Sequence, residues 1–324
     1  MDDPRVAFYL FDKNGIAIHW YGIIIAFGLI LGVVLGLREA KRRGYRSDMI
    51  LDLMLLAIPI CIVCARLYYV IFTWNTYAND LSKVFAVWEG GLAIYGAVIG
   101  GVIAALIFYK WRKVPMGEVL DIAAPSLIIG QAIGRWGNFV NQEAFGNLVT
   151  NPANQWFPYS VYIDRLGEWH QATFFYESMW NLLTFAILII LRKRIKVRGG
   201  IFALYLVLYG IGRFYIESLR TDSLMAGDVR VSQWLSAILV VCGIAFLIIM
   251  SRKKKEYKAY DGLYSLSWTD EQVAEYKKNK TRRQKTVDDM LSGPDTEEQK
   301  EYETKDNGKD EAIKKEDDTS EKDK

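Results

Sequence analysis

The chain has 324 residues, of which 52% are hydrophobic and 24% charged, and its formal net charge is +3. The apolar residues gather in runs of about 20, the length that crosses a bilayer core of about 30 Å, and this clustering excludes an ordinary soluble fold. The three cysteines, Cys61, Cys64 and Cys242, all lie inside apolar runs, so we interpret them as packing residues and exclude a disulfide framework.

Seven apolar runs predict seven membrane-spanning helices. The first run begins near Ile16 without a basic segment before it, so we interpret it as a span rather than a cleaved signal peptide. The fourth carries Glu118 and Asp121 at its start and Pro125 within it, and proline is tolerated where neighbouring helices satisfy the freed carbonyl. The predicted spans are residues 16–37, 49–72, 91–110, 117–134, 173–192, 200–219 and 231–251.

Basic residues alternate between the connecting segments. Lysine and arginine cluster after the first, third, fifth and seventh spans, whereas the other segments carry few. The positive-inside rule therefore predicts an all-α, polytopic integral membrane protein with its N-terminus outside and its C-terminus in the cytoplasm. We expect residues 1–251 to form the membrane domain. Residues 252–324 should form a charged, largely disordered tail, because they have too few large apolar side chains to offset the entropy of ordering.

Polar side chains that are costly inside a bilayer gather at the predicted outer ends of six spans. They are His19, Tyr21, Arg66, Tyr95, Arg135, Asn138, Asn141, Glu143, Tyr176, Glu177, Tyr209, Arg213, Glu217 and Arg220. This pattern predicts a cavity open to the outer leaflet. Trp20, Tyr68 and Tyr69 also fit simple interfacial anchors, and so does His19. Arg66 fits equally a structural partner of a carboxylate.

The segment from Gly134 to Gly146 reads GRWGNFVNQEAFG. Glycine permits close approach of the backbone to a ligand, and the guanidinium fork of Arg135 matches a phosphate. We predict a loop that lines a cavity, because a loop exposed to lipid would leave its backbone groups without partners. The alternative is an ordinary outer loop with a capping asparagine.

A second polar group lies on the sixth span. Tyr209, Arg213, Glu217 and Arg220 are spaced by four, four and three residues, so they share one face of a helix. Glu217 can pair with either arginine, and a purely structural ion pair is the alternative reading. Two arginines against one glutamate leave a surplus positive charge, which favours an anionic ligand such as a phospholipid head group.

At these two segments the sequence resembles the prolipoprotein diacylglyceryl transferase family. The family signature G-R-x-G-N-F-x-N-x-E-x-x-G matches Gly134–Gly146 without a break, and Y-G-x-x-R-F-x-x-E-x-x-R matches Tyr209–Arg220. The shorter motifs I-H-W-Y-G and A-R-L-Y-Y match Ile18–Gly22 and Ala65–Tyr69. The resemblance covers about residues 1–250 and leaves out the tail.

The resemblance implies an enzyme of the bacterial cytoplasmic membrane that faces the outer leaflet. Members transfer the diacylglyceryl group of phosphatidylglycerol to the thiol of a lipobox cysteine in a prolipoprotein signal peptide, the first step of lipoprotein maturation. The products are a thioether and glycerol 1-phosphate. The expected partners are phosphatidylglycerol, the prolipoprotein and membrane lipid; we expect no nucleic acid, no metal and no cofactor.

The resemblance also assigns roles to residues. The expected catalytic residues are Arg135, Arg213, Tyr95 and Glu217. The expected phosphatidylglycerol-binding residues are Tyr21, Arg135, Asn138, Glu143, Gly146, Tyr209 and Arg213. Arg135 and Arg213 should hold the phosphate and stabilise the thiolate, while Glu217 orients Arg213. Tyr95 stands where many members have histidine, and no general base is assigned. Ala172 stands where the family has proline, which should matter little because Tyr176 and Glu177 remain.

Three other classes of protein fit parts of the pattern. A transporter or flippase would suit a charged cavity, but paired broken helices are not evident in the sequence. A lipid phosphatase or acyltransferase would need a nucleophilic histidine or serine, or an H-x-x-x-x-D arrangement, in the outer group. A lipid-binding scaffold would need no chemistry at all. Only the transferase would form a thioether from phosphatidylglycerol and a lipobox peptide.

Overall fold

The computed structural model describes residues 5–10, 16–78, 80–221, 225–227, 229–252 and 260–291. Within these ranges seven helices are long and apolar enough to cross a membrane, which confirms the predicted polytopic all-α class. They are α1 (Trp20–Arg42), α2 (Asp48–Phe72), α4 (Ile94–Arg112), α5 (Met116–Asn141), α6 (Thr173–Leu191), α7 (Gly200–Leu219) and α8 (Val231–Arg252). The chain divides into two compact units, residues 1–267 and 268–324.

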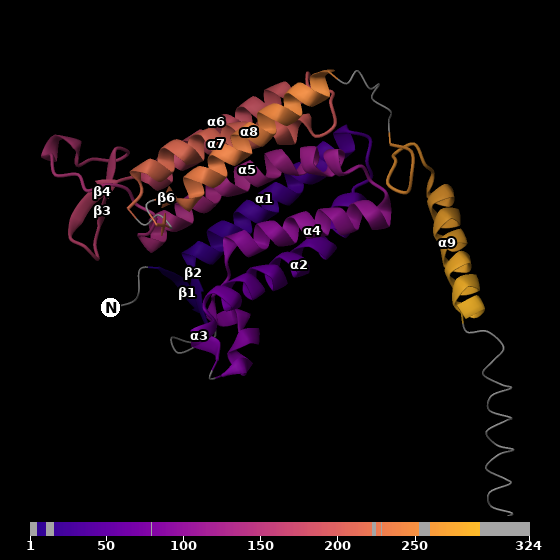
Figure 1. Ribbon diagram of the computed structural model, residues 1–324, viewed down its shortest axis with the longest axis horizontal. Helices are drawn as coiled ribbons and strands as arrows, with labels where there is room; N and C mark the ends of the chain where they lie inside the picture. The colour runs from indigo at the N-terminus through magenta and orange to yellow at the C-terminus, as the bar shows by residue number, and fades with distance from the viewer. Residues whose placement is uncertain are drawn as a thin grey trace, which may run out of the picture. The chain divides into compact units, whose positions relative to one another are not determined.

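The long helices form one bundle in which α1 packs on α5, α2 on α4, α5 on α6 and α7 on α8 (Figure 1). Glycines mark the closest crossings. A Cβ atom at Gly100 of α4 would lie 2.8 Å from the Cα atom of Cys61 in α2, and one at Gly210 of α7 would lie 2.8 Å from the carbonyl oxygen of Ser236 in α8. Small residues let helix backbones approach in lipid, where van der Waals packing drives association.

Two helices begin later than the sequence indicated. α1 begins at Trp20 rather than residue 16, because Ile16–His19 forms strand β2 and pairs with β1 (Val6–Leu10). α4 begins at residue 94 rather than 91, because Gly90 and Gly91 adopt φ values of 88° and 71°. Left-handed backbone of this kind is accessible to glycine and interrupts a helix.

Helix α5 corrects the interpretation of the GRWGNFVNQEAFG segment. The sequence predicted a loop from Gly134, but α5 continues to Asn141 and the chain leaves the helix only at Gln142, where φ is 49°. Gly134 and Gly137 therefore sit in a helix rather than a loop, whereas Gly146 lies in the loop that follows it. Gly137 lies directly against the ring of Tyr21, so its missing side chain serves helix packing.

The segments that follow α2, α5 and α7, and the chain before α1, meet at one end of the bundle, which we call the hairpin end (Figure 1). Within the described ranges, each β pair here is an antiparallel two-stranded sheet. The elements are α3 (Trp74–Tyr77), three 3-10 helices (Leu81–Phe85, Val87–Glu89 and Pro152–Asn154), β3 (Ser160–Ile163), β4 (Glu168–Gln171), β5 (Met225–Ala226) and β6 (Val229–Arg230).

At the opposite end, which we call the turn end, short turns join α1 to α2, α4 to α5 and α6 to α7. Buried carboxylates bind arginines here. Glu39 accepts a hydrogen bond from Arg192 at 2.7 Å, and Glu118 accepts from Arg43 at 2.9 Å and from Arg198 at 3.0 Å. A buried charge is costly without a partner, so these pairs explain why acids are tolerated at the start of α5.

A third buried acid at the turn end, Asp121 of α5, supports the start of α7. Its Oδ1 accepts from the backbone N–H of Phe202, and its Oδ2 accepts from that of Gly199, both at 2.9 Å. Gly199, with φ 81°, precedes α7 and has no capping side chain of its own. Asp121 thus caps a neighbouring helix and satisfies N–H groups that a helix start leaves unpaired.

Residues 260–267, which we call the strap, close the first unit at the turn end. The backbone N–H of Arg46 donates to the carbonyl of Tyr264 at 2.7 Å, and Leu266 donates to the carbonyl of Gly44 at 2.9 Å. The hydroxyl of Tyr264, which is buried, donates to Asp52 at 2.5 Å. Burial and this carboxylate raise the pKa of Tyr264, so the hydroxyl stays a neutral donor.

The second unit contains helix α9 (Asp270–Leu291), which the sequence analysis did not predict. Trp268 contacts Tyr276 within it, with ring centroids 5.7 Å apart. Residues 292–324 lie outside the described ranges, so the disorder expected there stays a prediction.

Candidate active site

Two arginines from different helices meet on one carboxylate at the hairpin end. Nη2 of Arg135 (α5) lies 2.7 Å from Oε1 of Glu177 (α6), and Nη1 of Arg213 (α7) donates to Oε2 of the same glutamate at 3.1 Å. Nη2 of Arg213 also lies 2.6 Å from Oε2 of Glu217. Both carboxylates are buried, which strengthens the ionic contacts. The two guanidinium groups therefore lie within reach of one anionic group.

The ion pairs of the site extend beyond α7. The sequence set Arg213 and Arg220 against Glu217, and the structure adds Arg135 from α5 and Glu177 from α6, so that Arg135 and Arg213 contact two buried carboxylates. The surplus charge expected from Arg220 stays a prediction. The contacts described engage Nη1 and Nη2 of each guanidinium group, which carries five N–H donors in all. The two arginine side chains keep 22% and 14% exposure, so part of each stays accessible to a ligand.

A hydrogen-bonded chain leads away from Arg135 along the end of α5. Its Nη1 donates to Oδ1 of Asn138 at 3.2 Å, and Nδ2 of Asn138 donates to Oε1 of Glu143 at 2.9 Å. Asn141 donates to the same oxygen at 3.4 Å. The chain folds back after α5, and the backbone N–H of Glu143 donates to the carbonyl of Asn138 at 3.0 Å. Glu143 therefore couples the loop after α5 to the arginine pair.

Gly146 holds that loop in place. Its N–H donates to the carbonyl of Gln171 at 2.9 Å, and Nδ1 of His170 lies 2.9 Å from its carbonyl oxygen. A Cβ atom at this position would lie 2.8 Å from Cγ2 of Thr173 and 2.9 Å from the carbonyl oxygen of Leu219. The close approach that requires glycine is thus to β4, α6 and the end of α7, and a role in substrate binding stays a prediction.

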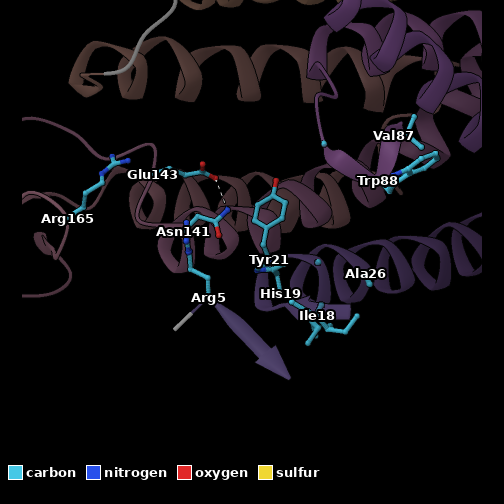
Figure 2. Close-up of a pocket in the computed structure, with 14 residues that line it drawn as sticks. Arg5, Ile18, His19, Tyr21, Ala26, Val87, Trp88, Asn141, Glu143 and Arg165 are labelled. Carbon is cyan, nitrogen blue, oxygen red and sulfur yellow. Dashed lines mark hydrogen bonds between the residues drawn. The ribbon is translucent and has the colours of Figure 1, made fainter. Parts of the chain in front are cut away.

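A hollow of about 1110 Å³ lies beside this network. Figure 2 shows Tyr21 projecting between Asn141 and Glu143 on one side and Val87 and Trp88 on the other. The lining residues are Arg5, Ala17, Ile18, His19, Tyr21, Gly22, Ile23, Ala26, Val87, Trp88, Gly90, Asn141, Glu143 and Arg165. The hollow therefore has an apolar wall and a polar wall, and Glu143 links it to the arginine pair.

One tyrosine of α7 lies beside the arginines, and a second, on α4, lies near that tyrosine. Tyr209 stacks on Tyr205 with ring centroids 5.6 Å apart, and it interacts electrostatically with Glu177, Arg213, Arg135 and Tyr95. The hydroxyl of Tyr95, at the start of α4, lies 3.4 Å from Oγ of Ser232 at the start of α8. Four long helices, α4, α5, α6 and α7, thus supply polar groups to one site.

Comparison with known proteins shows the family to which the chain is related. The profile of a family described as prolipoprotein diacylglyceryl transferase matches residues 7–249. A protein from Oceanobacillus iheyensis named phosphatidylglycerol–prolipoprotein diacylglyceryl transferase is 49% identical over 249 residues, which are 74% of this chain and 87% of that protein. This chain belongs to that family. Relatives of the same name from Limosilactobacillus reuteri and Bacillus licheniformis are 46% and 45% identical, covering 75% and 77% of this chain and 90% and 94% of their own.

The family motifs account for much of the site. The structure brings five of the predicted residues into one network of hydrogen bonds and ion pairs: Arg135, Asn138, Glu143, Arg213 and Glu217. Tyr21 and Tyr209 border that network, while Gly146 supports it from behind. The sequence placed Glu177 in the polar group but gave it no role. Its signals in the sequence were an acid in an apolar run and the family stretch that ends at Glu177, and neither says which helices the acid joins.

Proposed function

We propose that this chain transfers the diacylglyceryl group of phosphatidylglycerol to the lipobox cysteine of prolipoproteins. The sulfur of the cysteine attacks the carbon of the diacylglyceryl group that is bonded to the phosphate oxygen. A C–S bond forms, the C–O bond to the phosphate breaks, and glycerol 1-phosphate leaves. The thiol proton is released to the surroundings. The observation that carries this proposal is the pair of guanidinium groups on one buried carboxylate, inside an apolar bundle of this family.

Arg135 and Arg213 have the chemistry that this reaction needs. Negative charge grows on the phosphate as it leaves, and fixed cations stabilise it; losing one such donor typically costs roughly 3–4 kcal/mol. A free cysteine has a pKa of about 8.5, and nearby cations favour its reactive thiolate. Glu177 holds both guanidinium groups at a set spacing before substrate arrives, so little reorganisation is needed during the reaction.

The surrounding residues receive supporting roles in this proposal. Glu217 orients Arg213, and Asn138 with Glu143 positions Arg135 and the glycerol of the lipid head group. Tyr21, Tyr95 and Tyr209 shape the head-group site, and Gly146 keeps the loop after α5 close to α7. Tyr95 has no imidazole, and we assign no general base. The nearby arginines lower the pKa of the substrate cysteine, so its thiol loses the proton more readily without a base.

Thioether formation tests the proposal directly. Purified protein is incubated with vesicles that contain labelled phosphatidylglycerol and with a lipobox peptide, and the peptide product is measured by mass spectrometry. Arg135→Ala and Arg213→Ala should each reduce the rate by at least about 100-fold. Arg194→Ala, which removes an exposed arginine at the turn end, is the matched control and should keep the parent rate.

Other outcomes point to the rival functions. Near-parental rates in either variant would refute the assigned arginine roles. Lipid movement between leaflets without a thioether would indicate a flippase, and release of phosphate or fatty acid would indicate a different lipid enzyme. Binding of phosphatidylglycerol without any product would indicate a scaffold.

A further inference from the structure

Arg66 of α2 is buried and uses all three guanidinium nitrogens on main-chain carbonyl groups. Nε donates to Val84 at 2.9 Å and Nη2 to Lys83 at 2.6 Å, while Nη1 donates to Gly90 at 2.5 Å and to Gly91 at 3.0 Å. The sequence suggested a carboxylate as one possible partner of Arg66. The partners described are instead main-chain carbonyl oxygens. We call residues 83–91, which these bonds hold, the lip segment.

The geometry of this clamp requires arginine and glycine. A planar fork of donors reaches four carbonyl oxygens at once, which the single ammonium group of lysine cannot do. A Cβ atom at Gly91 would lie 2.5 Å from Nη1 of Arg66, so the backbone approaches the guanidinium group as closely as glycine allows. The ring of Tyr77 covers Arg66, with the guanidinium carbon 5.2 Å from the ring centroid.

The clamped lip segment presents two large aromatic side chains. Trp88 is 80% exposed and lines the hollow together with Val87 and Gly90. Phe85 is 79% exposed on the same segment but does not line the hollow. Figure 2 shows Trp88 and Val87 across the hollow from Asn141 and Glu143. Arg66 thus fixes the apolar wall of the hollow from behind.

We propose that Arg66 is a positioning residue that holds Trp88 as the binding wall for the polypeptide acceptor. The inference rests on the proposed function, because it needs a polypeptide as the second substrate. The phosphate of the lipid is assigned to Arg135 and Arg213, which do not line the hollow. The hollow reaches them through Glu143, so a chain bound there can bring its cysteine to the arginine pair.

The two walls suit a polypeptide better than an acyl chain. An extended polypeptide carries apolar side chains along with main-chain N–H and C=O groups, and it can use an aromatic wall and hydrogen-bonding groups together. Trp88 and Val87 offer the aromatic and apolar wall, while Asn141 and Arg165 offer hydrogen-bonding groups that the proposed lipid site does not use. An acyl chain has no hydrogen-bonding group for that polar wall.

Binding of a fluorescent lipobox peptide, measured by anisotropy without lipid, tests the wall independently of turnover. Trp88→Ala should weaken binding about tenfold, as for loss of an aromatic contact residue, and Trp88→Phe should recover most of it. Phe85→Ala is the matched control and should bind like the parent. In the thioether assay, Trp88→Ala should raise the KM for the peptide and leave kcat and the KM for phosphatidylglycerol unchanged.

Arg66→Lys tests the clamp. It should weaken peptide binding like Trp88→Ala, and the double variant should bind no more weakly than either single one, because both changes remove the same wall. Equal effects of Trp88→Ala and Phe85→Ala would overturn the inference, and so would a change confined to the KM for phosphatidylglycerol. If Arg66→Lys fails to fold, the Trp88 and Phe85 variants decide alone. If the peptide binds in a way that depends on Trp88 but no thioether forms, the proposed function is refuted, and the role of Trp88 in peptide binding stands.

Discussion

Two glycines of α5 that look equivalent in the sequence have different surroundings. A Cβ atom at Gly137 would lie 2.6 Å from Cδ2 of Tyr21, whereas one at Gly134 would lie 3.4 Å from Cδ1 of Ile25. The first contact forces the tyrosine ring to move, and the second is ordinary packing distance. Tyr21 lines the hollow, and the charges of Glu143 and Arg135 lie close enough to act on its hydroxyl. A displaced Tyr21 ring would therefore change the site.

The variants Gly137→Ala and Gly134→Ala should therefore differ in activity. Alanine favours a helix by about 1 kcal/mol over glycine, so neither change should unfold α5. Gly137→Ala should lower the rate of thioether formation by about tenfold or more, because it displaces Tyr21, and Gly134→Ala should stay near the parent rate. Equal rates for the two variants would contradict the role of this contact.

The sequence predicted the residue types of the site better than their pairing. Arg135, Asn138 and Glu143 belong to one motif, and helical spacing joined Arg213 to Glu217. Glu177 lies 36 residues from Arg213 and 42 from Arg135 along the chain, and only the packing of α5, α6 and α7 brings the three together. No local pattern carries that information, so the sequence did not show that Glu177 joins the two arginines.

Among the helices, α7 shows how distant parts of an element depend on each other. It carries Tyr209, Arg213 and Glu217 towards its C-terminal end, while its N-terminal N–H groups are satisfied by Asp121 of α5. A helix of this length spans about 30 Å, so an anchor at one end sets the position of side chains at the other.

Asp121→Ala should destabilise the bundle. The change leaves two backbone N–H groups at the start of α7 without their partner, while Arg43 keeps Glu39 and Glu118. Two unsatisfied buried donors cost on the order of 3 kcal/mol, which thermal unfolding in detergent would register as a lower Tm. Asp48→Ala is the control, since Asp48 is 61% exposed and pairs with Arg46 only at 3.7 Å. A Tm equal to that of the control would show that α7 needs no such cap.

The number of long helices could be predicted from the apolar composition of the chain, but the end of α5 could not. Apolar runs predicted seven helices, and all seven are present in the described ranges. The end of α5 was not predictable in this way, because glycine and asparagine commonly stop a helix, whereas here Gly137 packs against Tyr21 inside one. Tertiary packing overrode the local signal.

For the whole molecule, the two ends of the bundle differ in charge and architecture. The basic clusters that follow the first, third and fifth predicted spans fall at the turn end, and the arginine pair falls at the hairpin end. We therefore propose that the hairpin end faces outward, with the N-terminus, and that the tail from residue 252 is cytoplasmic. The division into residues 1–251 and 252–324 stays part of this proposal.

Labelling in intact cells tests the orientation. Single cysteines introduced by Leu166→Cys, between β3 and β4, and by Arg194→Cys, at the turn end, are placed in a background without Cys61, Cys64 and Cys242. A thiol reagent that does not cross the membrane should label only the first variant in intact cells and both after lysis. Labelling of the second variant in intact cells would reverse the proposed topology.

The strap, residues 260–267, packs on the bundle although it follows the last apolar helix. The family profile stops at residue 249, yet Tyr264 stacks on Phe108 of α4 and shares Asp52 with Arg112. A shortened chain that ends with its last apolar helix would uncover that phenylalanine and remove a main-chain pairing with the connection between α1 and α2. The compact unit of the bundle therefore extends through Ser267, eighteen residues beyond the end of the family profile.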